Sequence, residues 1–309
     1  MMKKLLKNFL LAIAGALTLS ASVVHAATAD TEPGSAKSAQ LRAKYEASAE
    51  ALRNNPYKRP MVIESNEGQN ALQGDVYAVL PHAFGAVSEA LTQAGPWCDI
   101  MILPVNTKGC RVTGGGERAG VSLRIGRKFD QPIRDAYPLE FAYRVIDKSA
   151  DYFAVRLDAG SGPLSTRDYR VVVEATPIEG NKTFLHLHYS YGFGVAGRIA
   201  MQAYLATAGA SKVGFSSSGG NLVGGMRGVV ERNTMRYYLA IESYLRSPGA
   251  SGLDRRLEAW FDGTEQYARQ LHEIDRGTYI AMKRREVERQ QTAFEGSGNA
   301  NVAGSSGRL

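Results

Sequence analysis

The sequence contains two cysteines, no long apolar segment after its first 26 residues, and none of the short motifs that mark common enzyme classes. The cysteines are not in CxxC spacing, so a redox or zinc motif is unsupported. The patterns GxSxG and HExxH, the Walker loop and the dinucleotide fingerprint are all missing. Gly114-Gly115-Gly116 indicates a turn rather than a phosphate cradle. These absences exclude the enzyme classes that such motifs identify.

Positive charge is modest once the first residues are set aside. The formal net charge is +7, and residues 1–26 contain three lysines and no acid, so the remainder carries about +4. No block of Lys and Arg with interleaved aromatic residues is present, of the kind that lines a nucleic-acid groove. We therefore expect an ordinary mixed surface with a basic lean and no nucleic-acid partner.

Residues 1–26 have the organisation of a cleavable export signal. Three lysines precede an apolar run from Phe9 to Leu19, which is shorter than the roughly 20 residues that span a bilayer. Small residues then lead to Val24-His25-Ala26, and signal peptidase accepts small residues at the outer positions of such a tripeptide. We expect cleavage after Ala26. No cysteine follows the run, so we expect a soluble, exported, periplasmic protein without a lipid anchor.

The two cysteines, Cys98 and Cys110, are candidates for a disulfide because an oxidising compartment favours one. Such a bridge would contribute about 3 kcal/mol to stability. The alternative is a pair of buried thiols that act as small apolar residues.

Composition divides the chain after the signal into four parts. They are a flexible lead with a short helix (27–60), one domain (61–249), a helical extension (250–294) and a Gly/Ser/Asn-rich tail that we expect to be disordered (295–309). Ser38 is the expected N-cap of the short helix, and Asn54-Asn55-Pro56 is its expected end.

Within the domain, short strand-like segments alternate with turn residues. We expect strands at 61–64 and 74–80, a helix at 82–94, and then strands at 99–103, 110–113, 120–125, 139–146, 152–158, 167–176 and 183–191. The last two are joined through Glu179-Gly180-Asn181-Lys182, where glycine and asparagine accept the positive φ of a tight hairpin. The pattern predicts an α+β protein with an antiparallel sheet.

A long helix is predicted over residues 226–245. Its apolar residues fall on one stripe, made up of Met226, Val230, Tyr237, Ile241 and Tyr244. Asn233 and Thr234 interrupt this stripe with polar groups. In a packed core neighbouring groups would satisfy them, whereas over a cavity they would contact a ligand.

The order of strand, helix, many antiparallel strands and long helix resembles that of the START-like (helix-grip) lipid-binding domain superfamily. The resemblance covers residues 61–247. Four segments show it best: GDVYAVLPHAFGAVSEALTQAGPWCDIM, GPLSTRDYRVVVEA, TFLHLHYSYGFG and GGMRGVVERNTMRYYLAIESYL. It implies a curved antiparallel sheet around the long helix, with a cavity between them for a sterol, acyl lipid or other apolar molecule. Because most members carry ligands and some are enzymes, the fold does not settle the function.

Seven side chains are the expected ligand contacts in that cavity. They are Val230, Asn233, Thr234, Tyr237 and Ile241 on the helix, with Tyr189 and Tyr191 on the last strand. An insertion at 192–225 adds a mildly apolar helix, predicted at 195–208, and a Ser/Gly-rich loop. This helix is expected to be a lid or a packing helix, and contact with a membrane is the alternative.

The extension over 254–294 carries apolar side chains at alternating steps of three and four. They are Leu257, Trp260, Thr264, Tyr267, Leu271, Ile274, Thr278 and Ala281, with Ser251 and Asp254 as an expected capping box. One interpretation is a single long helix packed on the outside of the domain. The other is a helical contact with a second copy or a partner protein.

His186 and His188 alternate along the last strand, so they lie on one face and Tyr189 and Tyr191 on the other. Alternation alone leaves open which face looks at the cavity. Two histidines can bind zinc only with a further ligand. The candidates for that ligand are His82, Glu174 and Asp168, and we expect no metal and no cofactor.

These observations predict a periplasmic binding or transport protein for an apolar or amphipathic small molecule, such as a lipid or sterol-like compound. The first alternative is a cavity hydrolase or cyclase that uses His186, His188 and a carboxylate, which would have to converge inside the cavity. The second is a scaffold built around the helical extension. Ligand identity, oligomeric state and any transient membrane or protein contact stay open.

Overall fold

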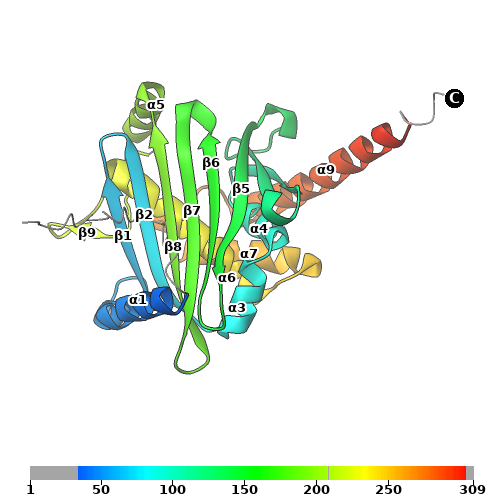
Figure 1. The fold of residues 1–309 in the computed structure, drawn as a ribbon. Coiled ribbons are helices and arrows are strands. Elements are labelled where there is room, and N and C mark those ends of the chain that lie inside the picture. The colour runs from blue at the N-terminus through cyan, green and yellow to red at the C-terminus, as the bar shows by residue number, and fades with distance from the viewer. Residues whose placement is uncertain (1–33, 208, 304–309) are drawn as a thin grey trace, which may run out of the picture. The chain divides into compact units, whose positions relative to one another are not determined.

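An eight-stranded antiparallel sheet is the main element of the computed structural model, which describes residues 34–207 and 209–303 (Figure 1). Its strands are β1 (Met61–Glu67), β2 (Ala71–Leu80), β3 (Thr107–Thr113), β4 (Gly120–Ile125), β5 (Tyr137–Lys148), β6 (Phe153–Ser161), β7 (Thr166–Ile178) and β8 (Lys182–Phe193). In space they follow the order β1-β2-β8-β7-β6-β5-β4-β3, with every pair antiparallel. Two short strands, β9 (Ser217–Ser218) and β10 (Asn221–Leu222), form a separate ribbon.

Helices lie on both faces of this sheet. They are α1 (Gly34–Ala47), α2 (Ala49–Arg53), α3 (Phe84–Leu91), α4 (Ala94–Met101), α5 (Val195–Ala206), α6 (Gly225–Arg246), α7 (Leu253–Glu265), α8 (Ala268–Leu271) and α9 (Arg276–Ala303). Short 3₁₀ turns are η1 (Gly116–Arg118), η2 (Ile133–Asp135), η3 (Pro163–Ser165) and η4 (Ala250–Gly252). The long helix α6 packs on β1, β2 and β8 behind the sheet as seen in Figure 1, and α1 packs on β7 and β8 in front of it.

The main core lies between the sheet and α6. Because side chains alternate along a strand, each strand contributes one face to this core. Val76 and Ala78 of β2, Leu187 of β8 and Ile241 of α6 are all buried there. A smaller core under α1 and α2 contains Leu41 and Leu52. The sheet that grips α6 confirms the expected α+β, helix-grip (START-like) fold.

Local signals in the sequence predicted several elements correctly. The hairpin between β7 and β8 turns at Gly180 and Asn181, which both have positive φ (73° and 56°). The segment predicted at 226–245 is α6, and the segment predicted at 195–208 contains α5. The short N-terminal helices end at Arg53, directly before Asn54-Asn55-Pro56.

Two predictions in the N-terminal part of the chain are wrong, a strand at 99–103 and the N-cap at Ser38. Residues 99–103, predicted as a strand, lie in α4 and the turn that follows it. Gly95-Pro96, directly after the helix predicted at 82–94, occupies the first turn of α4, where a missing N–H costs no hydrogen bond. The N-terminal helix begins at Gly34, so Ser38 is not its N-cap. The hydroxyl of Ser38 is buried and lies 2.9 Å from the Thr176 hydroxyl of β7.

The extension is not one long helix. It is divided into α7, α8 and α9, with breaks at Tyr267 and after Leu271. The hydroxyl of Tyr267 donates to the carbonyl of Tyr57 (2.8 Å), which fixes the first break against the domain. Asp275 accepts the N–H of Thr278 (2.9 Å) at the start of α9. The expected capping box is also wrong, because Gly252 is the N-cap of α7 and makes no side-chain hydrogen bond.

Some predictions for the two ends of the chain fall outside the described residues. α9 continues to Ala303, whereas we expected disorder from residue 295. Residues 304–309 lie outside the described part, as do the predicted signal peptide and its predicted cleavage site after Ala26.

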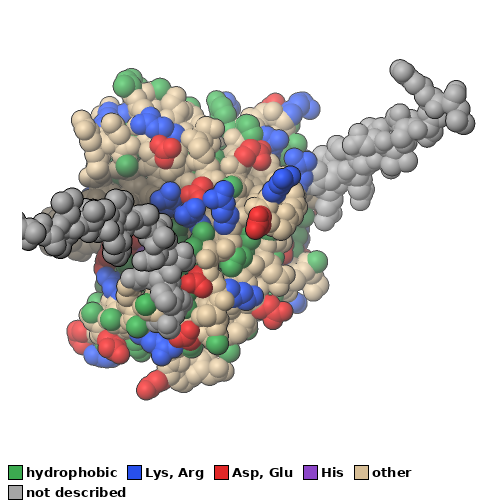
Figure 2. Space-filling view, viewed as in Figure 1, with side chains coloured by type: hydrophobic (Ala, Val, Ile, Leu, Met, Phe, Trp, Pro, Cys, Tyr) green, Lys and Arg blue, Asp and Glu red, His purple; other side chains and the backbone are tan. Residues whose placement is uncertain are grey.

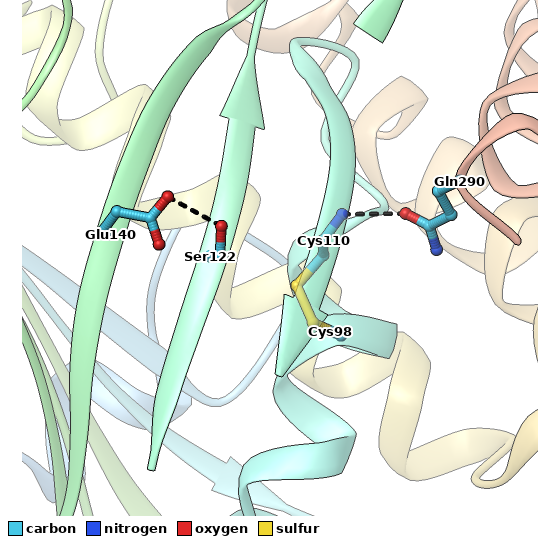
Figure 3. The surroundings of a disulfide bond; sticks show 5 residues. All are labelled: Cys98, Cys110, Ser122, Glu140 and Gln290. Carbon is cyan, nitrogen blue, oxygen red and sulfur yellow. Dashed lines mark hydrogen bonds between the residues drawn. A yellow bond between two sulfur atoms is a disulfide. The ribbon is translucent and has the colours of Figure 1, made fainter. Parts of the chain in front are cut away.

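The predicted disulfide is confirmed, and it joins α4 to β3 (Figure 3). Cys98 and Cys110 have Cα atoms 5.2 Å apart. The N–H of Cys110 donates to the side-chain oxygen of Gln290 on α9 (2.9 Å). The bridge therefore lies where α4, the edge strand and the helical extension meet.

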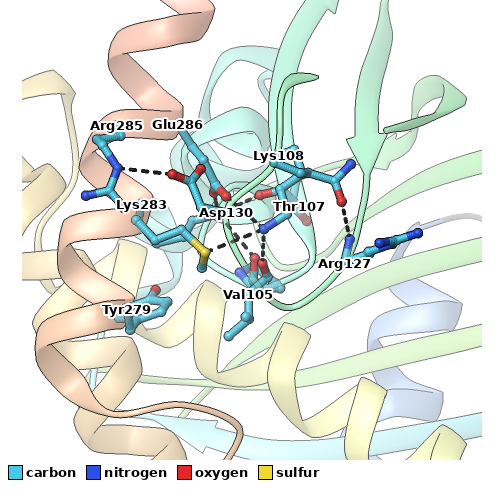
Figure 4. A network of polar contacts seen from close by, with 12 residues as sticks. Val105, Thr107, Lys108, Arg127, Asp130, Tyr279, Lys283, Arg285 and Glu286 are labelled. Carbon is cyan, nitrogen blue, oxygen red and sulfur yellow. Dashed lines mark hydrogen bonds and ion pairs between the residues drawn. The ribbon is translucent and has the colours of Figure 1, made fainter. Parts of the chain in front are cut away.

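A buried charge cluster attaches α9 to the loop between α4 and β3 (Figure 4). Glu286 lies between two lysines, 2.8 Å from Lys108 Nζ and 2.7 Å from Lys283 Nζ, and all three side chains are at most 1% exposed. The ammonium groups also donate to backbone carbonyls, that of Lys108 to Val105 and that of Lys283 to Thr107. This anchoring holds the loop at residues 104–106, which forms part of the cavity wall described next.

Candidate ligand-binding cavity

A cavity of about 400 Å³ lies between the sheet, α5 and α6. Strands contribute Ile125, Leu139, Thr166, Tyr169, Tyr189 and Tyr191, α5 contributes Gly197, Ala200, Met201 and Tyr204, and α6 contributes Val229, Arg232, Asn233, Arg236 and Tyr237. Loops complete the wall with Pro104, Val105, Asn106, Lys128, Pro163, Leu164 and Glu273. A cavity of this size falls in the range that holds small-molecule ligands.

The cavity stripe of α6 follows directly from helical geometry. Val229, Asn233 and Arg236 are spaced by four and three residues, so their side chains lie above one another on one face. Arg232 and Tyr237 flank them. On the neighbouring face, Val230 and Thr234 pack against β2, where Gly74 leaves room for them. A Cβ atom built at Gly74 would lie 2.3 Å from the Thr234 hydroxyl.

Four of the seven predicted ligand contacts line the cavity, namely Asn233, Tyr237, Tyr189 and Tyr191. The other three, Val230, Thr234 and Ile241, do not. All three are at most 1% exposed in the core under the sheet, and the Thr234 hydroxyl donates to the Val230 carbonyl (2.8 Å). The stripe of α6 that faces the cavity is therefore displaced by about one residue from the predicted apolar stripe. The reason is that apolar residues of this helix face the packed core as well as the cavity.

Tyrosines form one wall of the cavity. The rings of Tyr169 and Tyr191 stack with centroids 5.4 Å apart, and those of Tyr189 and Tyr237 meet edge-on at 5.1 Å. Burial raises the pKa of Tyr237 to about 12, and burial raises the pKa of Tyr189 well above its ordinary value. These phenols are therefore neutral at physiological pH. They present flat apolar surface together with hydroxyl groups that can donate or accept a hydrogen bond.

A cluster of charged side chains occupies another part of the wall. Glu273, which follows α8, lies 2.5 Å from Arg236 Nη2 and 2.7 Å from Lys128 Nζ. Lys212 Nζ lies 3.9 Å from the same carboxylate. Arg236 also donates to the side-chain oxygen of Asn233 (3.3 Å). The pKa of Glu273 is lowered by the nearby cations, Arg236 foremost, although burial opposes this shift.

Helix α5 covers one side of the cavity and also carries exposed apolar residues. Met201 faces inward, and its sulfur lies 3.7 Å from the Tyr191 hydroxyl. Val195 and Ile199 are 77% and 60% exposed, and Leu164 beside the helix is 59% exposed. A second hollow of about 600 Å³ shares Leu164, Pro163 and Ile125 with the cavity. Both roles proposed for the insertion, lid and membrane contact, therefore remain proposals.

The two histidines of β8 lie on the opposite face of the sheet, because Tyr189 and Tyr191 occupy the cavity face. His186 lies 2.7 Å from a Glu174 oxygen and 2.8 Å from an Asp75 oxygen. His188 lies 2.9 Å from the same Asp75 oxygen. The convergence inside the cavity that the enzyme alternative requires is therefore not found.

The remaining candidate metal ligands are scattered. Asp168 pairs with Arg167 (3.2 Å) at the start of β7, and His82 lies before α3. In the part of the chain that the structure describes, no group of three His, Cys, Asp or Glu side chains could hold a metal ion. Figure 2 shows positive and negative side chains mixed over the face of the molecule that it views.

Sequence reasoning missed the charged part of the cavity. Arg232 and Arg236 lie at i, i+4 next to Asn233, a spacing that would have revealed a polar face on this helix. Lys128 and Glu273 lie in connecting segments far apart in the sequence. No local pattern brings these two residues together.

No family model and no curated protein sequence matches the chain. Among solved structures, the chain is similar to norcoclaurine synthase from Thalictrum flavum (10% identity, 48% of this chain and 78% of that chain, TM-score 0.31). It is also similar to a conserved protein of unknown function from Enterococcus faecalis (8% identity, 80% and 98%, TM-score 0.33). A protein from Nitrosospira multiformis is 17% identical over 51% of this chain and 97% of its own, with a TM-score of 0.27. The fold assignment rests on the strand order and the position of α6.

Proposed function

We propose that this helix-grip protein binds an apolar or amphipathic small molecule in the cavity between its sheet and α6, and carries it without chemical change. The observation that supports this most is the cavity itself, about 400 Å³ of space beside an otherwise closely packed core. Apolar area that a ligand buries there would contribute about 25 cal/mol per Å² to binding. Tyr189, Tyr191, Tyr237 and Asn233 can orient one polar end of the ligand.

We further propose that the carrier works outside the cytoplasm. The signal-like residues 1–26 motivate this proposal, and the disulfide supports it because such bonds persist in oxidising compartments. The described residues include no helix that is long and apolar enough to cross a membrane. The exported chain should begin at Ala27, which intact-mass measurement of protein from the periplasmic fraction will check. A main product of full length in the cytoplasm would contradict it.

Uptake of a neutral fluorescent probe, N-phenyl-1-naphthylamine, tests the carrier proposal. The purified protein should enhance its fluorescence in a saturable way. Val229→Trp should weaken probe binding at least about tenfold, because an indole would fill space that Val229 leaves open on the cavity stripe. Circular dichroism should show that this variant keeps its fold.

The matched control is Val230→Trp, one residue further along α6. Val230 is fully buried against β2, so overpacking there should lower the free energy of unfolding by about 1–3 kcal/mol. If neither substitution changes probe binding, or the unaltered protein binds no probe and no lipid co-purifies with it, the carrier proposal is wrong.

A further inference from the structure

The cavity wall contains more positive than negative charge. Three cationic residues line it, Lys128, Arg232 and Arg236, against one carboxylate, that of Glu273. Lys212 adds a fourth positive charge close to the same carboxylate. The face shown in Figure 2, by contrast, carries positive and negative groups mixed together.

Arg232 is the residue that this excess leaves without an acidic partner. Its side chain is almost fully buried, with the residue 2% exposed, and its Nη1 donates to the carbonyl of Val213 (3.2 Å). Among the described residues no carboxylate lies within ion-pair distance of Arg232, whereas Arg236 and Lys128 both reach Glu273. The neighbouring Glu231 is no substitute, because it points to the loop and accepts the N–H groups of Phe215 (2.6 Å) and Ser216 (2.9 Å).

The cations also affect one another. Burial lowers the pKa of Arg236, and the nearby Arg232 lowers it further, while Glu273 opposes the shift. A guanidinium inside a protein is unfavourable unless a charge or several acceptors compensate it. One backbone carbonyl meets only part of this need, because the group has five N–H donors.

We propose that the ligand of this cavity is an anionic amphiphile, whose negatively charged head group binds Arg232 beside Arg236 and whose apolar body lies along the tyrosine wall. This inference rests on the proposed carrier function and names its ligand class. A carboxylate or phosphate matches the planar fork of guanidinium donors. The apolar body would extend toward Met201 and Leu164, where the cavity adjoins the second hollow.

The test compares head groups on one apolar chain. Isothermal titration calorimetry should be carried out on the unaltered protein with decanoate, decyl phosphate, 1-decanol and decylammonium. We expect at least one of the two anions to bind about tenfold or more tightly than the alcohol, and decylammonium to bind more weakly than the alcohol. The tighter anion identifies the head group as a carboxylate or a phosphate.

A variant then locates the head group. Arg232→Met keeps an apolar stem and removes the charge, so the preference for the anion over 1-decanol should fall about tenfold. Arg227→Met is the matched control, because Arg227 lies on the same helix, donates to the Ser65 hydroxyl (3.1 Å) and does not line the cavity. That control should keep the preference. A purely structural role of Arg232 would change stability without changing the ratio of the two affinities.

The outcomes separate the two proposals. If 1-decanol and N-phenyl-1-naphthylamine bind but neither anion binds more tightly than the alcohol, the anionic ligand is wrong and the carrier function stands. The same conclusion follows if Arg232→Met folds and keeps the full preference. If no probe binds at all, the carrier proposal itself fails.

Discussion

His186 connects two strands through carboxylates on both of its ring nitrogens. Asp75 of β2 and Glu174 of β7 flank it. The Tyr77 ring stacks on the imidazole with centroids 4.2 Å apart, and Lys44 Nζ lies over the Tyr77 ring, 4.4 Å from its centroid. Although burial opposes this shift, the carboxylates of Asp75 and Glu174 raise the pKa of His186 to about 8. The histidine is therefore protonated at neutral pH and stabilises the sheet as a cation between two anions.

This arrangement predicts a loss of stability at alkaline pH. A raised pKa stabilises the fold fully below about 6.5, the value in the unfolded chain, and the contribution is lost as pH rises through about 8. The contribution of His186 to the free energy of unfolding, measured by urea denaturation, should fall by about 2 kcal/mol between pH 6 and pH 9. His186→Gln should remove most of this decrease, whereas His82→Gln should retain it. An unchanged slope in His186→Gln would contradict the assignment.

The carboxylates act in the opposite direction. Hydrogen bonds from His186 and His188 lower the pKa of Asp75, and hydrogen bonds from His186 and Tyr152 lower that of Glu174, against the effect of burial. Their stabilisation is present above the unfolded values and is lost as pH falls through the folded ones. The combined contribution of His186, Asp75 and Glu174 to the free energy of unfolding should therefore be greatest between about pH 4.5 and 6.5.

Glu286 is the second residue on which a local charge balance depends. It is the only carboxylate paired with the buried ammonium groups of Lys108 and Lys283 among the described residues. Glu286→Gln should lower the free energy of unfolding by about 3–5 kcal/mol, because two buried cations would lose their counter-charge. Glu89→Gln, at an exposed position of α3, is the control and should change stability little. Equal unfolding midpoints for both variants would show that the backbone carbonyls suffice.

Residue types predicted the tyrosine wall but not the charged cluster. Alternation along the strand alone places Tyr189 and Tyr191 on one face. It does not decide whether that face looks at the cavity. Arg232 resembles an ordinary surface residue in the sequence. Its burial depends on the loop that carries Val213, and no pattern within α6 shows where that loop lies.

At the scale of elements, the disulfide fixes α4 against β3. The chain between the two cysteines is short (sequence separation 12), so removing the bridge should cost about 3 kcal/mol through the freedom that the unfolded chain regains. Replacing Cys98 and Cys110 together by Ala should lower the urea midpoint accordingly. A reducing agent should lower the midpoint of the parent and leave that of the double variant unchanged. A parent midpoint that does not respond to reduction would contradict this prediction.

Elements with strong local signals were predictable, and those that depend on tertiary contacts were not. The hairpin at Gly180-Asn181 and the long helix α6 follow from turn chemistry and apolar periodicity. The helix α4 was mistaken for a strand because its first turn contains Gly95-Pro96. The extension was mistaken for one helix because the apolar steps continue through Tyr267, although that side chain turns the chain toward Tyr57.

The whole molecule combines two kinds of interior, a packed core and an open cavity on adjacent faces of one helix. From sequence these faces look alike, because both need apolar residues at helical spacing. Val230 and Val229 are neighbours of the same type, yet one meets β2 and the other meets the cavity. The existence of a sheet around a long helix could be predicted, whereas the stripe facing the space depends on where β2 lies.

A ligand that enters this space should stabilise the entire fold, because the unfolded chain has no cavity to bind it. At a free ligand concentration of 100 Kd, binding contributes about 2.7 kcal/mol, which corresponds to a rise in Tm of roughly 5–10 °C for a domain of this size. Scanning calorimetry with increasing decanoate should show this rise in the unaltered protein, and Val229→Trp should show little of it. Because neither Cys98 nor Cys110 lines the cavity, the variant with both replaced by Ala should show a similar rise in Tm from a lower starting value. If decanoate binds by calorimetric titration but leaves Tm unchanged, it does not bind selectively to the folded cavity, and the site proposed here is incorrect.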